Sequence, residues 1–340
     1  MNRQPLGTTS LVVPPIIFGT SCLGNLYEAL PWETKLAILR EMVAHVPAPV
    51  VLDTAGKYGA GLALEIIGRG LRELDVSPAQ VIISNKLGWQ RVPLRGSEPT
   101  FERGVWAGLE HDAEQLISYG GIRKCFEQGC ELLGGVYRPQ VVSVHDPDEY
   151  LAAGDRRQRK QDILEAYRAL SELKQQGVVA AVGVGSKDWT IIRELAGNVA
   201  LDWVMLACSL TILRHPPELL NYVAELNRRK ISIINSAVFH AGFLTGGKFF
   251  DYRIPQLPAD QALFDWRESF QRVCRTHAVA PATACVQFAL SPPGVISVAL
   301  NTSQPDHVRR NVALVQTKIP EEFWTDLKQE KLIASDYPYL

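Results

Sequence analysis

Eight short apolar runs, separated by stretches with helical spacing, extend along almost the whole chain. They cover residues 15–20, 50–54, 81–86, 141–146, 180–186, 203–209, 231–239 and 295–301. Each run is mostly apolar instead of alternating in polarity, which is typical of parallel strands covered on both faces. Strands that alternate with helices in this way favour a closed (β/α)8 TIM barrel. An open doubly wound sheet is the alternative, but no G-x-G-x-x-G motif follows the first run.

Length and composition are consistent with one barrel domain over residues 1–340, since no internal repeat or linker interrupts the chain. The net charge of -1 shows no basic excess, which disfavours nucleic acid as a partner. The N-terminal stretch 1–18 contains a short apolar segment broken by Pro14 and Pro15, with neither a signal-peptide profile nor the length of a membrane span. We therefore expect a cytoplasmic protein with no membrane partner.

The cysteine pattern indicates free thiols and not disulfide bonds. The chain has six cysteines and no C-x-x-C pair, so we expect buried free thiols and no metal site.

Ionisable residues stand where three of the apolar runs end. Asp53 closes the second run, Lys86 the third and His145 the fourth, while Tyr58 follows Asp53 in a glycine-rich turn. The carboxyl ends of neighbouring parallel strands gather at one rim, where α/β enzymes place their active sites. We therefore predict that these four side chains meet.

Together the four side chains form a plausible proton relay. A phenol has an ordinary pKa of about 10, which is too high for easy proton exchange near neutrality. An adjacent lysine ammonium favours the phenolate, an aspartate orients the lysine, and a histidine hydrogen-bonds a substrate oxygen. Such a relay, without a nucleophile or metal, suits carbonyl–alcohol interconversion with a bound hydride carrier.

Each of the four residues also has a purely structural interpretation. Asp53 and Lys86 are compatible with capping or ion pairing at a strand end, and Tyr58 with packing in a loop. His145 precedes Asp146 and Pro147, which are common turn residues. The coincidence of complementary groups on three different strands favours the functional interpretation.

The chain resembles the aldo-keto reductase superfamily along nearly its whole length. The resemblance is carried by LGTTSLVVPPIIFGT, LDTAGKYGAGLALEIIGRGL, SVHDP, GVGS, GFL and NTSQPDHVRRNVAL. It implies a (β/α)8 barrel that uses NAD(P)H, with Asp53, Tyr58, Lys86 and His145 as the catalytic tetrad. The segments NLYEAL, GVWAGLEHD and ISYGGIRKCFEQGCELLG are similar to a sugar-oxidising branch. That branch contains aldose 1-dehydrogenases acting on L-fucose, L-galactose or D-threo-aldoses, and a pyridoxal 4-dehydrogenase.

The resemblance also implies a cofactor lying extended over the barrel mouth, without a glycine-rich dinucleotide loop. The implied cofactor contacts are Ser186, Cys208, Ser236, Phe239, Gly242, Phe243, Leu244, Thr302, Gln304, His307, Arg310 and Asn311. The segment 301–340 is expected to cover the cofactor. For Gly242 a turn glycine, and for Phe243 a packed apolar residue, are equally simple interpretations.

Several of these positions depart from the pattern of the superfamily. Cys208 replaces a Gln or Asn that many relatives have after the sixth strand, and Ser236 replaces an aromatic ring that stacks on the nicotinamide. His307 aligns with an arginine that many NADP-dependent relatives direct at the 2′-phosphate, although Arg310 is close in sequence. The resemblance implies a slight preference for NADP, with NAD also usable.

The substrate is expected on the other side of the mouth, beneath a long loop at about residues 87–121. Candidate substrate contacts are Tyr27, Trp89 and Trp106, since aromatic rings cover the C–H faces of sugars. His111, Glu110 and Asp146 are alternative hydrogen-bonding groups for the ring hydroxyls. We predict an aldose oxidised at C1 to its lactone, with Tyr58 as general base or acid. The alternatives are a general aldehyde or pyridoxal oxidoreductase, and a cofactor-binding regulatory barrel with little turnover.

Overall fold

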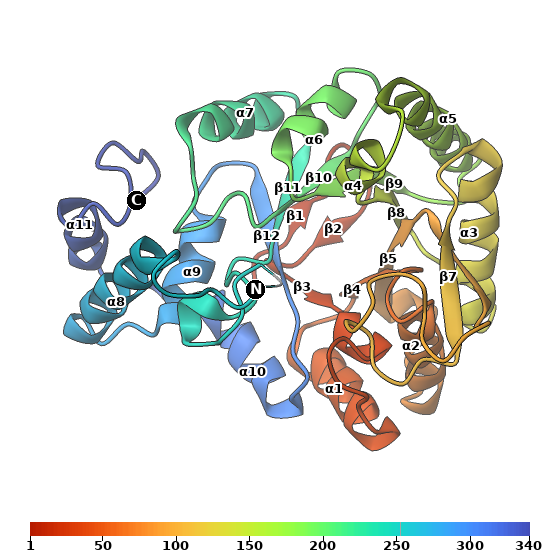
Figure 1. Cartoon of the computed structure of the whole chain (residues 1–340), viewed down its shortest axis with the longest axis horizontal. Coiled ribbons are helices and arrows are strands. Elements are labelled where there is room, and N and C mark those ends of the chain that lie inside the picture. The colour runs from red at the N-terminus through yellow and green to blue at the C-terminus, as the bar shows by residue number, and fades with distance from the viewer. Residues whose placement is uncertain (252) are drawn as a thin grey trace.

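The computed structural model describes residues 1–251 and 253–340, and its centre is a closed barrel of eight parallel strands (Figure 1). The strands follow one another around the barrel in chain order. They are β3 (Ile16–Gly19), β4 (Val50–Ala55), β5 (Val81–Leu87), β8 (Val141–His145), β9 (Ala181–Ser186), β10 (Trp203–Ala207), β11 (Ser232–Ser236) and β12 (Val295–Leu300). The expectation of a (β/α)8 barrel is confirmed.

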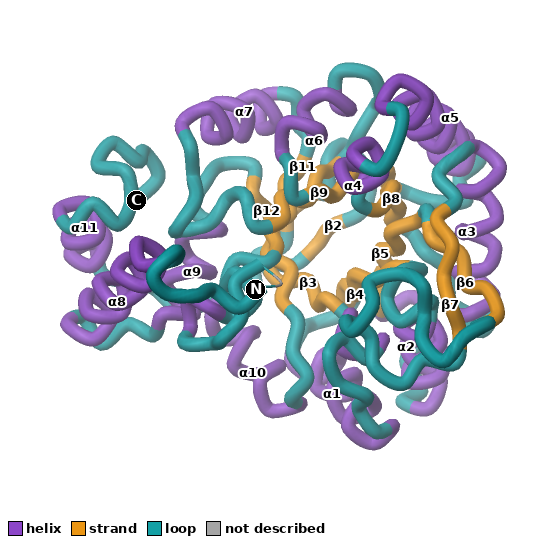
Figure 2. The backbone as a smooth tube through the Cα atoms, in the orientation of Figure 1, coloured by secondary structure: helices purple, strands orange, loops and turns teal. Residues whose placement is uncertain are grey.

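Helices surround the barrel, as the tube in Figure 2 shows. The α-helices of the described residues are α1 (Trp32–His45), α2 (Leu62–Glu73), α3 (Tyr119–Leu132), α4 (Pro147–Ala152), α5 (Arg156–Gln175), α6 (Trp189–Ala196), α7 (Pro217–Arg228), α8 (Gln261–Thr276), α9 (Pro281–Leu290), α10 (Pro305–Leu314) and α11 (Glu321–Gln329). Short 3₁₀ turns are η1 (Ser21–Gly24), η2 (Pro78–Gln80) and η3 (Phe243–Thr245). None of the helices in these residues combines the length and apolar character needed to cross a membrane.

The barrel strands bury both faces, and alternate residues divide between them. Val51, Ile82 and Val141 belong to one apolar cluster that fills the barrel interior. Their neighbours along each strand, such as Leu52 and Ile83, pack outward against the helices. Because side chains in a strand alternate with a period of two, the inward face continues upward from these residues to the rim.

Trp203 is fully buried and occupies the barrel interior opposite Gly183. A Cβ built on Gly183 would lie 2.2 Å from the indole ring. Only a residue without a side chain leaves room for the tryptophan here.

Two antiparallel hairpins lie outside the barrel sheet. The first joins β1 (Gln4–Pro5) to β2 (Val12–Val13), and its Leu6 and Val13 pack into the interior cluster. The second joins β6 (Trp89–Pro93) to β7 (His111–Gln115). The expected long loop at 87–121 is therefore anchored by a hairpin, which its irregular sequence did not reveal.

The C-terminal part of the chain packs on the flank of the barrel. Helices α8, α9 and α11 form a third apolar cluster with Phe243, Phe323 and Tyr337, visible in Figure 1 as the group beside the C-terminus. Of the segment 301–340, residues 301–303 line the cavity described below. The cofactor-covering role of the whole segment 301–340 stays a prediction.

Candidate active site

Three strand ends place ionisable side chains on the inward face of the barrel. Asp53 lies two residues after Val51, Lys86 four residues after Ile82, and His145 four residues after Val141, so each shares the inward face of its strand. The register pairs Ala55 with Lys86, which brings the ends of β4 and β5 together. All three ionisable residues are buried.

The turn after β4 brings the phenol of Tyr58 to the same point. The Tyr58 amide donates to the carbonyl of Ala55 at 3.1 Å, which closes the turn. Gly59 follows with φ of 61°, and a Cβ there would lie 2.2 Å from the carbonyl oxygen of Gly24. The turn thus requires glycine after the tyrosine and fixes the direction of the phenol ring.

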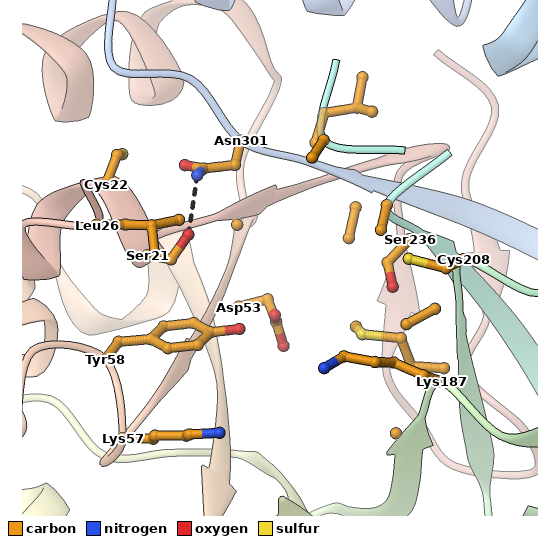
Figure 3. Close-up of a pocket in the computed structure, with 18 of the residues that line it drawn as sticks. Ser21, Cys22, Leu26, Asp53, Lys57, Tyr58, Lys187, Cys208, Ser236 and Asn301 are labelled. Carbon is orange, nitrogen blue, oxygen red and sulfur yellow. Dashed lines mark hydrogen bonds between the residues drawn. The ribbon is translucent and has the colours of Figure 1, made fainter. Parts of the chain in front are cut away.

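The four predicted catalytic side chains meet. Lys86 Nζ donates to the Tyr58 hydroxyl at 3.1 Å and forms a buried ion pair with Asp53. Ser84 Oγ donates to the other carboxylate oxygen of Asp53 at 3.2 Å. Figure 3 shows the hydroxyl of Tyr58 beside the carboxylate of Asp53 at the edge of the cavity. The ring of His145 lies edge-on to that of Tyr58, with 5.7 Å between centroids.

Burial has the largest effect on the pKa of the Tyr58 phenol. It raises the pKa of Tyr58 above its ordinary value, while the positive charge of Lys86 acts in the opposite direction. Burial also lowers the pKa of Lys86, but Asp53 and Tyr58 outweigh it, so the pKa of Lys86 is raised overall. The lysine therefore assists the phenolate as expected from the sequence, although the net effect in the free protein is a protonated phenol.

His145 is neutral near physiological pH. Burial is the largest cause that lowers its pKa, to about 3, while Asp146 raises it and Lys57 and Lys86 lower it further. A neutral imidazole has one N–H donor and one acceptor nitrogen. It can therefore hydrogen-bond a substrate oxygen without adding a charge to the site.

A cavity of about 570 Å³ opens above these side chains, at the carboxyl ends of the strands. This volume lies within the range of roughly 300–1,000 Å³ that is typical of sites for small molecules and cofactors. The cavity extends from Tyr58 past Ser186 and Cys208 to Gly242 and Thr302. Its position at the carboxyl-terminal rim is the one where barrel enzymes hold their substrates.

The structure divides the predicted cofactor residues into three groups. Those that line the cavity are Ser186, Cys208, Ser236, Phe239, Gly242 and Thr302. Phe243 and Leu244 are fully buried, and their side chains pack in the third apolar cluster, so contact of these two residues with the cofactor stays a prediction. Gln304, His307, Arg310 and Asn311 lie at the start of α10 and along it, beyond the residues that line the cavity.

Cys208 belongs to a hydrogen-bonded cluster at the rim. Its thiol contacts the Asp251 carboxylate, and burial is the main cause that raises the pKa of Cys208 to about 12. His240 Nδ1 pairs with Asp251 at 2.8 Å and Nε2 with the Thr211 hydroxyl at 2.8 Å. Ligand atoms of Cys208, His240 and Asp251 lie within 4.8 Å of one another. Because both ring nitrogens already have partners, the cluster functions as a hydrogen-bonded support for the rim.

The predicted substrate residues fall into two groups, one that lines the cavity and one that does not. Tyr27 and Trp106 line the cavity, and Tyr27 stacks on Phe249 with 5.7 Å between ring centroids across the mouth. Trp89 packs on Phe101 beneath the loop, and His111 pairs with Pro93 in the β6–β7 hairpin. The β6–β7 hairpin holds Trp89 and His111 outside the cavity lining, so their contact with substrate stays a prediction.

Sequence reasoning missed a charged cluster beside the phenol. Lys57 Nζ lies 2.7 Å from Glu102, 3.1 Å from Asp146 and 3.3 Å from Glu149, and Lys187 pairs with Glu149 at 2.8 Å. A lysine directly before Tyr58 on the turn was the available signal, but its carboxylate partners come from two other segments, the long loop and the start of α4. Only the fold brings them together.

Comparison with known proteins agrees with this geometry. A model of the aldo/keto reductase family matches residues 15–331. The chain belongs to this family. It is 27% identical to pyridoxal 4-dehydrogenase of Microbacterium luteolum, covering 98% of each chain. It is 28% identical to D-threo-aldose 1-dehydrogenase of a Pseudomonas species, covering 96% of each. An aldo-keto reductase of Bacillus halodurans in its holo form superposes with a TM-score of 0.71 at 21% identity, over 98% of this chain and 97% of that one.

Membership of the family identifies the protein as an NAD(P)-dependent oxidoreductase with a small-molecule carbonyl substrate. Proteins with different substrates match it at similar identity. The family alone does not specify the substrate, which depends on the residues that line the cavity.

Proposed function

We propose that this oxidoreductase converts a cyclic aldose to its lactone by oxidation at C1, with Tyr58 as the group that exchanges the proton. The observation that carries the proposal is the 3.1 Å contact between Lys86 Nζ and the Tyr58 hydroxyl at the edge of the cavity. On the substrate side, Trp106 provides an apolar wall, and Lys57, Glu102 and Asp146 provide hydrogen-bonding groups. A ring with apolar C–H faces and several hydroxyls matches this combination.

The residues of this chain fit an extended nicotinamide nucleotide. The cavity runs from the tetrad to Thr302, and Ser186 and Ser236 offer hydroxyls along it. Gly242 has φ of 88°, and a Cβ placed on it would have no atom within 4 Å, so the backbone there is open to a ligand. When bound, an oxidised nicotinamide accepts a hydride from the carbon that is oxidised.

The protein's own part in the reaction is proton transfer and orientation. The Tyr58 phenolate accepts the proton from the C1 hydroxyl, which leaves the C1 oxygen as the lactone carbonyl once the hydride has departed. Lys86 stabilises the phenolate through its positive charge, and Asp53 keeps the ammonium in place. His145 hydrogen-bonds the C1 oxygen and holds it against the phenol. The reverse steps reduce an open-chain aldehyde.

NADP is the proposed cofactor, with NAD as a usable alternative. His307 and Arg310 are exposed on α10, the helix that begins directly after the cavity lining. A guanidinium grips a phosphate in a bidentate manner, so Arg310 is the candidate partner of a 2′-phosphate. The six free cysteines fit a reducing compartment, which supports a cytoplasmic location.

Pyridoxal is the second candidate substrate, favoured by the similarity to pyridoxal 4-dehydrogenase over 98% of the chain. The aromatic ring of pyridoxal suits the wall formed by Tyr58 and Trp106, whose ring centroids are 5.9 Å apart. A regulatory barrel with little turnover is disfavoured, because the complete proton relay is assembled and polarised.

A substrate panel tests the proposal. Purified protein is supplied with NADP⁺ or NAD⁺ and with L-fucose, L-galactose, D-threose or pyridoxal, and nicotinamide absorbance is followed. We expect steady turnover of at least one aldose, with the lactone identified as product. Turnover restricted to pyridoxal or simple aldehydes would replace the aldose proposal with the second candidate, and absence of turnover on every carbonyl would favour the regulatory barrel.

A further inference from the structure

The charged cluster around Lys57 has a function beyond the tetrad. Lys57 is 3% exposed and lines the cavity, and its ammonium contacts three carboxylates. A buried lysine with this many partners requires specific compensation for its lost hydration. Figure 3 shows Lys57 and Lys187 pointing into the same space beside Tyr58.

Asp146 is the member of this cluster that faces the reaction centre. Its Oδ2 accepts a hydrogen bond from Lys57 at 3.1 Å and lies 3.4 Å from Nε2 of the catalytic His145. Its Oδ1 takes no hydrogen bond from any residue that the structure describes, and the residue lines the cavity. An ionised carboxylate only accepts hydrogen bonds, so Oδ1 is an open acceptor.

The backbone holds this acceptor in a strained position. Asp146 adopts φ of 46° and ψ of 56°, directly between the end of β8 and Pro147 at the start of α4. A non-glycine residue in this region costs conformational energy, and such residues concentrate at functional sites. Lys57 fixes the side chain from the β4 turn, so the two segments must fold together to form the cluster.

The same lysine ties the long loop to the barrel. Glu102, from the loop between the strands of the second hairpin, contacts Lys57 at 2.7 Å through one oxygen and accepts from Trp106 Nε1 at 2.7 Å through the other. Trp106 is the apolar wall of the substrate side. One ammonium therefore sets both the polar and the apolar surfaces that a substrate meets.

We propose that Asp146 accepts a hydrogen bond from the substrate hydroxyl on the carbon next to the reacting one, and that Lys57 is the residue that positions Asp146. This inference rests on the proposed function and deepens it. The reacting oxygen sits between Tyr58 and His145, and vicinal oxygens on a sugar are about one hydrogen-bond length apart. A carboxylate beside His145 Nε2 is therefore placed for the neighbouring hydroxyl.

The formal charges of the cluster also restrict the substrate. Two lysines, Lys57 and Lys187, face three carboxylates, Glu102, Asp146 and Glu149, which leaves an excess of one negative charge. This net negative charge repels a phosphate or carboxylate group on the substrate. The subsite therefore selects uncharged hydroxylated carbonyl compounds.

The experiment compares substrates with and without this hydroxyl. kcat/KM is measured for oxidation of L-fucose against 2-deoxy-L-fucose, and for reduction of lactaldehyde (2-hydroxypropanal) against propanal. The variants are Asp146→Gly, which accepts the positive φ, Lys57→Met and Lys57→Arg. Lys160→Met, in a partly exposed pair with Glu194, is the matched control.

The wild type should prefer the hydroxylated member of each pair by roughly 10- to 100-fold, because a site built for a hydroxyl discriminates against its absence. Asp146→Gly should bring the preference close to one, Lys57→Met should lower it at least about 5-fold, and Lys57→Arg should restore part of it. Lys160→Met should leave the preference and the propanal kcat/KM within about 3-fold of the wild type. In Asp146→Gly the loss of kcat/KM on propanal should be smaller than the loss on the hydroxylated aldehyde, since propanal has no hydroxyl to lose.

Two results would overturn the inference: an unchanged preference in Asp146→Gly, or an equal loss on propanal, which would indicate a merely structural role. The proposed function fails separately. If neither sugar is oxidised but the preference for lactaldehyde over propanal still depends on Asp146, the subsite stands and the aldose proposal falls. If sugars are oxidised but the preference for the hydroxylated substrate is unchanged in Asp146→Gly, the aldose proposal stands and the subsite falls.

Discussion

Replacing Lys86 with methionine tests whether the tetrad contains a buried ion pair. Asp53 and Lys86 are 3% and 5% exposed, so the substitution leaves the Asp53 carboxylate buried with the Ser84 hydroxyl as its remaining side-chain donor. Breaking a buried pair by removing one partner costs about 3–5 kcal/mol. A domain with a stability well above about 5 kcal/mol, within the usual range of about 5–15 kcal/mol, remains mostly folded after this loss, whereas one at the lower end unfolds partly.

The free energy of unfolding is measured by urea denaturation at pH 7.5. Because the folded-state pKa of Lys86 is raised, its stabilising effect is present below the ordinary lysine pKa of about 10.4 and is lost only as the pH rises through the folded value. At pH 7.5 the full effect is therefore observed. The matched control, Lys160→Met, removes a partly exposed pair with Glu194 and should cost less than about 1 kcal/mol.

The double variant Asp53→Asn with Lys86→Met separates charge from packing. Because the amide carries no charge, it should recover at least about 1.5 kcal/mol of the loss seen in Lys86→Met. Turnover should remain absent, since Tyr58 still lacks its cation. If Lys86→Met alone costs less than about 1 kcal/mol, the reasoning that Asp53 is a buried charge held by this lysine is wrong.

Three further predictions concern pH, cofactor choice and packing. Because burial raises the pKa of Tyr58, kcat/KM for aldose oxidation should rise with pH while that for aldehyde reduction stays nearly level, and any activity left in Lys86→Met should need a higher pH for oxidation; pH–rate profiles between pH 6 and 10 check this. Arg310→Ala should raise the KM for NADP⁺ roughly 5- to 20-fold and leave that for NAD⁺ nearly unchanged, as steady-state kinetics with each nucleotide will show. Gly183→Ala should destabilise the fold by about 1–3 kcal/mol in a denaturation curve, since its Cβ would lie 2.2 Å from the Trp203 ring.

The barrel was predictable because its strands are short, apolar and regularly interrupted. The sequence also indicates which side chains point into the barrel. Asp53 lies two residues after the inward-facing Val51, and His145 lies four residues after the inward-facing Val141. The convergence of the tetrad then follows from the closure of the barrel. Local pattern and global fold agree in this part of the chain.

The direction of a side chain could not be predicted where it depends on packing against distant segments. Trp89 carries a ring suited to a sugar, but the β6–β7 pairing turns it beneath the loop against Phe101. Phe243 follows a glycine at the cavity, yet its side chain points into a cluster formed by the C-terminal helices. No pattern within either segment specifies these orientations, because the packing partners are remote in sequence.

Lys57 is a functional candidate that the sequence around it does not indicate. A lysine in a glycine-rich turn is usually solvated. Its burial arises from carboxylates contributed by the long loop and by the start of α4. The loop's irregular sequence concealed the hairpin that delivers Glu102, so the cluster could not be assembled from sequence alone.

The most direct test of the account is the turnover of Tyr58→Phe together with its affinity for NADP⁺. Removal of one hydroxyl deletes the proton acceptor and leaves the ring packed against Trp106 and His145. The account predicts a loss of at least about 10³-fold in kcat, with a nucleotide dissociation constant within about 3-fold of the wild type by fluorescence titration. Wild-type turnover in this variant would contradict the central claim that the phenol beside Lys86 carries the proton.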